Sequence, residues 1–359
     1  MLRIFEIILT IKFYTMRTLF LLIVVLICKF SIGQDIIEIP FKALDEDYIE
    51  LVNAIQEIEN SESKQVINLE DKDFEKFNDL DTRFLMFWQL SFHYSDLKEY
   101  EKCFEILKKG QSEGFFFVLD PEHDFPSYLK EIEKFDGYQS FVEQNQSLIK
   151  ETDATTNTEY MVQLPEEYDE NKNYPLFLIT HGGAGCIPSM QYAYISEKLK
   201  KKFIVAYFQG SSIEGSYSRS FSRTKWSEQV NNGYKQIISK YPVDTSEIIL
   251  SGPSSGGGRS IILGINNIIP ASGLLLNFSV IPRGLSNDSY VKSAERGLKV
   301  VQLCCENDWG IQQQKEFGYW LDKYTIKNRF LIFPDKGHEY PANFQHHLDT
   351  SIEFLLKKN

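Results

Sequence analysis

Residues 248–258 read Ile-Ile-Leu-Ser-Gly-Pro-Ser-Ser-Gly-Gly-Gly, and this stretch decides the fold. An apolar run typical of a buried strand enters a glycine-rich turn, and a second apolar run at 259–265 has the character of a helix. The turn contains the pattern Gly-x-Ser-x-Gly, in which Gly252 and Gly256 flank Ser254. Side chains at the two glycine positions would clash in a sharp strand-to-helix turn. The pattern predicts a strained Ser254 with an exposed hydroxyl, as a nucleophile requires.

A structural glycine-rich turn that happens to contain serines is the alternative to a nucleophile. Ser251 and Ser255 are weaker candidates than Ser254, because Ile249 and Pro253, not glycines, stand two residues before them. A phosphate-binding P-loop is excluded, since no Gly-Lys-Ser or Gly-Lys-Thr follows the turn. The helix expected after the turn points its N-terminus at the serine, which favours a negative charge developing there.

Short apolar runs recur on both sides of this turn and alternate with amphipathic segments. They lie at 176–180, 203–208, 274–278, 300–304 and 330–333. Near-continuous apolar strands separated by helices are typical of a parallel sheet that is covered on both faces. We therefore expect an α/β fold with a doubly wound, mostly parallel sheet over residues 156–359, preceded by a small all-α region.

A His-Gly-Gly loop at 181–183 directly follows one of the predicted strands. Such a loop lets a backbone N–H face the carbonyl oxygen of a substrate. The oxyanion hole is predicted to combine the N–H of Ser255 with that of Gly183 or Ala184. His181 itself is predicted to shape the loop rather than to act as a base.

Two other predicted strands end next to groups that suit a triad. Asp308 follows the strand at 300–304 and suits the acid that orients a histidine; Glu306 is the second choice, and a solvated acidic loop is the structural alternative. His338 follows the last strand and is the natural general base. The order Ser254, Asp308, His338, with separations of 54 and 30 residues, is the order that one known fold requires.

With these motifs together, residues 158–358 resemble an α/β-hydrolase. More narrowly, they resemble the secreted serine esterases that include dienelactone-hydrolase-like, feruloyl-esterase-like and polyhydroxybutyrate-depolymerase-like enzymes, with prolyl-oligopeptidase catalytic domains as relatives. The resemblance is carried by 164–169, 174–176, 181–183, Asp244, 252–257, Asp308 and 337–338. It implies a serine hydrolase that cleaves a carboxylic ester, carried by a small molecule or a polymer, through an acyl-enzyme intermediate and without a cofactor.

Two other functions stay open at this point. One is a peptidase of the prolyl-oligopeptidase type, although the chain before the predicted sheet is too short for a propeller domain. The other is a catalytically silent hydrolase fold whose helical part binds a protein partner, because fold alone never proves activity.

The substrate-binding surface is predicted in the loop that precedes the helix before the nucleophile. Loops at the carboxyl ends of strands line the site in this sheet type. Tyr217, Phe221 and Trp226 lie in or next to this loop and are candidates to bind an aromatic or sugar group. Burial under the loop is the alternative for all three.

Residues 34–155 have helical periodicity. Apolar residues from Tyr48 to Ile58 fall on one helix face, and further helices are expected at 81–94, 98–109 and around 129–141. The pair at 81–110 weakly resembles a tetratricopeptide hairpin; a small helical domain packed on the rest of the chain is the alternative. We find no catalytic constellation in this region.

Residues 1–33 match a secretory signal peptide when they are read from a start at Met16. Arg17 precedes an apolar run at 19–28, and small residues stand before a cut at Gln34. This run is shorter than the roughly 20 residues that a bilayer span needs, so a membrane anchor is the weaker alternative. The expected location is secreted or periplasmic.

The overall composition sets the class of protein. The 359 residues are 43% hydrophobic and 25% charged, which excludes general disorder. A net charge of −12 argues against a nucleic-acid partner. No Cys/His spacing suits a metal, so no metal site is expected. After residue 33 the cysteines are interpreted as packing residues or free thiols, with a Cys103–Cys186 link left open.

Overall fold

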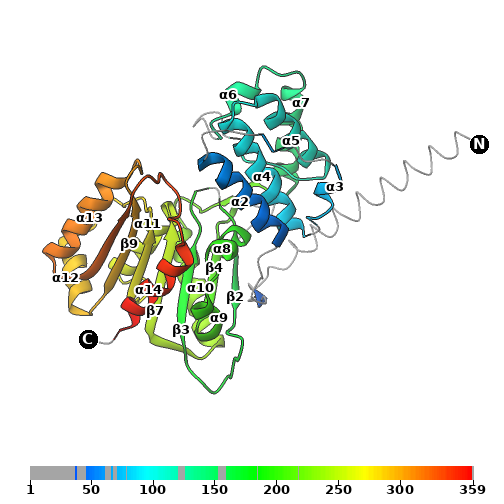
Figure 1. Cartoon of the computed structure of the whole chain (residues 1–359). Helices are drawn as coiled ribbons and strands as arrows, with labels where there is room; N and C mark the ends of the chain where they lie inside the picture. The colour runs from blue at the N-terminus through cyan, green and yellow to red at the C-terminus, as the bar shows by residue number, and fades with distance from the viewer. Residues whose placement is uncertain are drawn as a thin grey trace, which may run out of the picture.

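The structure is a computed structural model. It describes residues 37–38, 46–60, 66–67, 71–77, 79–119, 126–152, 159–183, 185–216 and 218–357. The predicted signal peptide at 1–33 therefore lies outside the described residues, as do Ala184 and Tyr217. Figure 1 shows a helical region at one end of a twisted sheet that is flanked by helices.

The sheet has eight strands in the order β1-β2-β4-β3-β7-β8-β9-β10. Their bounds are β1 Ile37–Glu38, β2 Glu159–Gln163, β3 Tyr174–Thr180, β4 Ile204–Gln209, β7 Val243–Pro253, β8 Gly273–Asn277, β9 Lys299–Cys305 and β10 Lys327–Phe333. From β4 to β10 all neighbours are parallel, whereas β2 runs antiparallel to β4 and β1 runs with β2. The expected doubly wound, mostly parallel sheet is confirmed.

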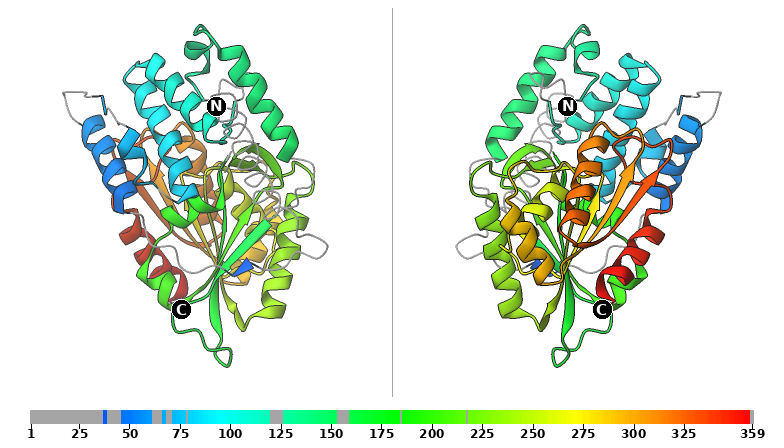
Figure 2. Two further views of the ribbon diagram at one scale, coloured as in Figure 1. Left: turned by 90° about the vertical axis from the view of Figure 1, so that its right-hand side faces the viewer. Right: turned by 90° about the vertical axis from the view of Figure 1, so that its left-hand side faces the viewer.

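Helices cover both faces of the sheet. On one face lie α10 Trp226–Lys240, α11 Ser255–Ile265, α12 Asn287–Glu295 and α13 Ile311–Lys323. On the other lie α8 Ile187–Ala193, α9 Glu197–Lys202 and α14 Phe344–Leu356. Figure 2 shows α14 (red) and α10 (yellow-green) on opposite sides of the strands.

Each central strand contributes side chains to the cores on both faces of the sheet, because successive side chains point to opposite faces. In β3, Leu176 and Leu178 join the core under α10 and α11, while Phe177 and Ile179 join the core under α8 and α14. All four side chains are fully buried. This explains why the strands are near-continuous apolar runs in the sequence.

The helical region consists of six helices in the described residues. They are α2 Glu46–Asn60, α3 Asp71–Phe74, α4 Leu80–Asp96, α5 Tyr100–Ser112, α6 Leu129–Ile132 and α7 Tyr138–Thr152. Asp79 caps α4 by accepting a hydrogen bond from Thr82 N at 3.0 Å. An aromatic core that includes Phe84, Phe87 and Phe117 holds these helices together.

This region packs directly on the sheet half of the chain. Tyr192 of α8 belongs to the core of the helical region. Next to it stands a hairpin of β5 Ser212–Gly215 and β6 Ser218–Ser220. Phe116 N donates to Ser216 Oγ and Ser216 N donates to Phe116 O, both at 2.7 Å. The helical region is therefore hydrogen-bonded to the β5–β6 hairpin.

Several elements were not expected from the sequence. The antiparallel β2 and the two-residue β1 were missed, and β1 comes from the segment assigned to the helical region. The helices predicted at 81–94 and 98–109 are α4 and α5. The tetratricopeptide likeness and the domain bounds remain predictions. In the described part of the chain, no helix is long and apolar enough to cross a bilayer.

Candidate active site

Ser254 occupies the turn between β7 and α11. Its backbone has φ +52° and ψ −125°, a conformation that a residue with a side chain rarely adopts. The flanking glycines are required by contact: a Cβ on Gly256 would lie 2.1 Å from Thr180 O, and one on Gly252 would lie 2.4 Å from the same atom. The tight turn against the end of β3 therefore explains the Gly-x-Ser-x-Gly pattern.

The structure brings Ser254, His338 and Asp308 together. His338 Nε2 lies 2.8 Å from Ser254 Oγ, and His338 Nδ1 lies 3.0 Å from Asp308 Oδ1. The Asp308 side chain is fully buried, and the His338 side chain is 26% exposed. Glu306, the second choice for the acid, is exposed, and it is Asp308 that lies at Nδ1 of this histidine.

Three donors hold the Asp308 carboxylate. Besides His338, Gly310 N donates to Oδ1 at 2.8 Å and Gln314 Nε2 donates to Oδ2 at 2.8 Å. A buried carboxylate that accepts hydrogen bonds from several donors is fixed in place. Because it accepts the Nδ1 proton, the Nε2 lone pair faces Ser254, as proton removal from a hydroxyl requires.

Two aromatic rings flank the imidazole of His338. Phe278 meets it edge-on, with ring centroids 4.9 Å apart and 74° between the planes, and is buried. Trp309 stacks on it at 5.0 Å and 29°, and is 65% exposed. The imidazole is thus held between a buried ring and a ring open to solvent.

The 181–183 loop lies against the nucleophile turn. A Cβ on Gly182 would be 3.4 Å from Ser254 Cβ, whereas a Cβ on Gly183 would meet no atom within 4 Å. Ser255 is the first residue of α11, so its N–H has no partner within the helix. Ser255 thus directly follows Ser254, and Gly183 directly follows the glycine that lies against it; these are the positions predicted to supply the oxyanion donors.

His181 is fully buried and holds this loop in shape. Its Nε2 accepts from Gly210 N at 3.0 Å, so Nδ1 carries the proton and donates to Gly182 O at 2.7 Å. Burial lowers the pKa of His181 to about 3. The side chain is therefore neutral at physiological pH, in agreement with a structural function.

The proposed substrate residues have different surroundings. Phe221 is 6% exposed: its ring lies 4.6 Å from the His181 ring and 4.2 Å from the Arg259 guanidinium. Arg259 Nη1 donates to His181 O at 3.0 Å and to Ser255 Oγ at 3.2 Å, and burial lowers its pKa to about 10. Trp226 packs against the core under α10. Phe221 is thus buried and Trp226 partly buried, and their binding of a substrate ring remains a prediction.

A buried network supports the nucleophile turn from behind. The Tyr194 hydroxyl lies 3.0 Å from Ser251 Oγ and accepts from Asn277 Nδ2 at 2.7 Å. Ser251 Oγ donates to Leu275 O at 2.8 Å, and Ser254 N donates to Asn277 O at 2.9 Å. Burial raises the pKa of Tyr194, so the phenol stays protonated. These bonds fix the end of β7 to β8 and α8.

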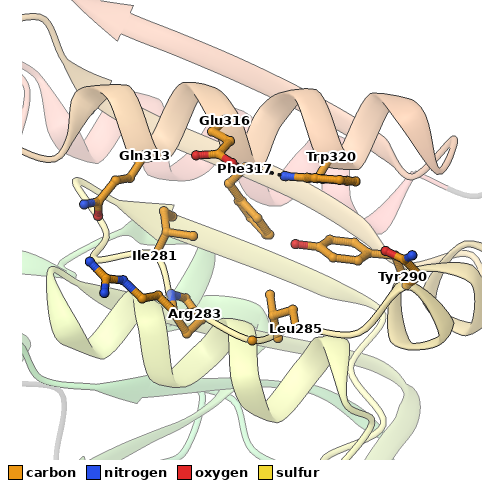
Figure 3. A pocket seen from close by; sticks show the side chains of 11 residues that line it. Ile281, Arg283, Leu285, Tyr290, Gln313, Glu316, Phe317 and Trp320 are labelled. Carbon is orange, nitrogen blue, oxygen red and sulfur yellow. Dashed lines mark hydrogen bonds between the residues drawn. The ribbon is translucent and has the colours of Figure 1, made fainter.

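A pocket of about 410 Å³ lies between residues 281–290 and α13 (Figure 3). Tyr290, Phe317 and Trp320 form its aromatic side, and Arg283, Gln313 and Glu316 are among its polar residues. Two residues that line the pocket directly adjoin, along the chain, residues that contact Ser254 or Asp308. Val280 N donates to Ser254 O at 3.0 Å and precedes Ile281, and Gln314 follows Gln313.

The described residues contain no group of three His, Cys, Asp or Glu side chains that could hold a metal ion. The cysteines of the described residues are buried and free: Cys103, Cys186, Cys304 and Cys305. The Cys103–Cys186 link is therefore not formed in this structure.

Known proteins give little further information. No family model and no curated protein matches the chain. A solved structure of an uncharacterized protein from Bacillus cereus has 18% identity and a TM-score of 0.48, covering 87% of this chain and 99% of its own. A Thermogutta terrifontis esterase has 14% identity and a TM-score of 0.44, covering 57% of this chain and 93% of its own. A Bacillus cereus carboxylesterase has 18% identity and a TM-score of 0.44, covering 55% and 93%.

Sequence reasoning missed four residues of the site. Gln314 lies six residues after Asp308, and its contact depends on the first turn of α13. Trp309 directly follows Asp308, and this position next to the predicted acid could have marked it as a residue of the site. Phe278 and Arg259 carry no sequence signal, because nothing in their neighbourhood along the chain marks contact with a histidine.

Proposed function

We propose that this protein is a secreted serine hydrolase that cleaves a carboxylic ester. The observation that supports the proposal is the continuous line of contacts from Ser254 Oγ through His338 to Asp308, at 2.8 and 3.0 Å. Such spacing is within reach of proton transfer. The strained turn that presents Ser254 is the second support.

In the first half of the proposed reaction, Ser254 Oγ attacks the ester carbonyl carbon while His338 Nε2 takes its proton. The carbonyl π electrons move to the oxygen and form a tetrahedral oxyanion. Asp308 stabilises the imidazolium that results. The N–H of Ser255 and that of Gly183 or Ala184 donate to the oxyanion, and one such donor is typically worth about 3 kcal/mol in the transition state.

In the second half, the oxyanion collapses and the bond to the alcohol oxygen breaks. His338 Nε2 gives its proton to this leaving oxygen, and the acyl group stays on Ser254. A water then attacks the acyl carbon, with His338 again taking the proton. Collapse of the second tetrahedral state releases the acid and restores the Ser254 hydroxyl.

Residue substitution and active-site labelling test the proposal. Ser254→Ala should abolish hydrolysis of p-nitrophenyl acetate and labelling by a fluorophosphonate probe. Ser246→Ala is the matched control, because Ser246 is an exposed residue near the start of strand β7, and this variant should keep both. Near-full activity of Ser254→Ala would overturn the assignment.

Two further outcomes separate the alternatives. Preferential cleavage of a proline-containing peptide over esters would favour the peptidase, and a folded wild type that takes up no probe would favour the silent fold. Secretion is supported by the pattern at 1–33, and amino-terminal sequencing of the exported protein should begin at Gln34.

A further inference from the structure

Trp309 is the most exposed large hydrophobic side chain in the described part of the chain, at 65%. A single surface tryptophan ordinarily needs no explanation. This one lies over the imidazole of His338, with ring centroids 5.0 Å apart and 29° between the planes. Among the described residues, His338 is the ring that Trp309 stacks on, so the other indole face is left to solvent.

Packed neighbours cover much of the His338 imidazole, and they limit the directions from which a substrate can approach it. Phe278 packs edge-on against the imidazole and is 6% exposed, and it also packs against Tyr340 at 5.0 Å. Asp308 fills the space beyond Nδ1. Of the two rings that pack on the imidazole, Trp309 is therefore the one that a substrate arriving from solvent can reach.

The chemistry of the proposed reaction identifies the alcohol as the part of the substrate nearest His338. His338 Nε2 returns its proton to the leaving oxygen, which must come within hydrogen-bond distance of this atom. The acyl oxygen points instead to the N–H groups at Ser255 and the 181–183 loop. The group attached to the leaving oxygen is therefore the one next to Trp309.

We propose that Trp309 is a specificity-determining residue that stacks on a ring in the leaving alcohol, an inference that rests on the proposed function. An indole face packs against an aromatic ring or against the C–H face of a sugar ring, without charge or hydrogen bonds. The nearby charges on the His338 loop do not oppose a neutral ring, because Lys336 and Glu339 pair with each other at 3.5 Å. The favoured substrates are esters of ring-bearing alcohols.

A set of acetates that differ only in the alcohol tests this proposal. Benzyl acetate and 6-O-acetylglucose carry an aromatic and a sugar ring, and ethyl acetate carries none; acid release is followed by pH-stat titration. In Trp309→Ala and Trp309→Leu, the preference in kcat/KM for a ring-bearing acetate over ethyl acetate should fall about tenfold, mainly through KM. Trp309→Phe should keep most of it. The acetate whose preference falls identifies an aromatic or a sugar ring.

The matched control is Tyr319→Ala, because Tyr319 is also exposed, at 61%, but lies in α13. This variant should keep the wild-type preference. Two results for Trp309→Ala would overturn the inference. One is an unchanged preference for ring-bearing acetates. The other is an equal loss of kcat/KM for all three acetates, since Trp309 would then act through His338. Ester hydrolysis that does not depend on Ser254 would overturn the proposed function instead, and it is detected before any Trp309 variant is compared.

Discussion

Replacement of Ser254 by glycine and by alanine tests the strain in the nucleophile turn. At φ +52° and ψ −125°, a residue with a Cβ is held in an unfavourable conformation, at a cost of about 1–3 kcal/mol. Glycine removes that strain. It also adds unfolded-state entropy worth about 0.5–1 kcal/mol. We therefore expect Ser254→Gly to have a free energy of unfolding about 1 kcal/mol higher than Ser254→Ala.

Comparing the two variants with each other isolates the backbone. Both lose the hydroxyl and its 2.8 Å contact with His338, so this loss cancels. The assay is urea unfolding at pH 7, followed by tryptophan fluorescence. The midpoint should be higher for glycine, with an unchanged slope. Both variants should be inactive towards p-nitrophenyl acetate, which shows that the added stability brings no function.

A control position with ordinary helical backbone should give the opposite sign. Ser147 is exposed within α7, where Ser147→Gly should be about 1 kcal/mol less stable than Ser147→Ala. If Ser254→Ala proved as stable as Ser254→Gly while Ser147 behaved as expected, the strained turn would be refuted.

Three further predictions concern the groups around the turn. Asp308→Asn should lower kcat about 10⁴-fold with little change in KM, because the imidazole loses the acceptor that fixes its tautomer; a fall under tenfold in steady-state kinetics would contradict it. Gly256→Ala should lose about 1–3 kcal/mol or more in urea unfolding, because its Cβ would lie 2.1 Å from Thr180 O, while Gly337→Ala, with open space at its Cβ, stays within about 0.5 kcal/mol. Burial holds the pKa of His181 at about 3 in the folded protein, against an ordinary value of 6.5. Between these two pH values only the unfolded state takes up the proton, so the free energy of unfolding falls as the pH drops through this window. The advantage of wild type over His181→Gln in free energy of unfolding should shrink by about 2 kcal/mol from pH 7 to pH 5, and a constant difference would exclude this account.

Much of the sheet was predictable because its strands are buried on both faces. Leu176 to Ile179 leave no polar side, so the run is visible without any structure. The antiparallel β2 was missed because its apolar run is only three residues long, between Glu159 and Gln163. The pairing of β1 with β2 joins residues far apart in the chain, and local pattern cannot predict such a contact.

The sequence alone determined the Gly-x-Ser-x-Gly pattern, which marks the strand-to-helix turn, and the order of the three groups of the site. Only the tertiary structure decided that Ser254 and His338, 84 residues apart, lie 2.8 Å from each other. Parallel strands bring their carboxyl ends to one edge of the sheet, and this geometry exists only after the sheet has formed. The same holds for the aromatic residues. Phe221 and Trp309 both stand in loops, and packing of distant segments buries the first and leaves the second exposed beside the histidine.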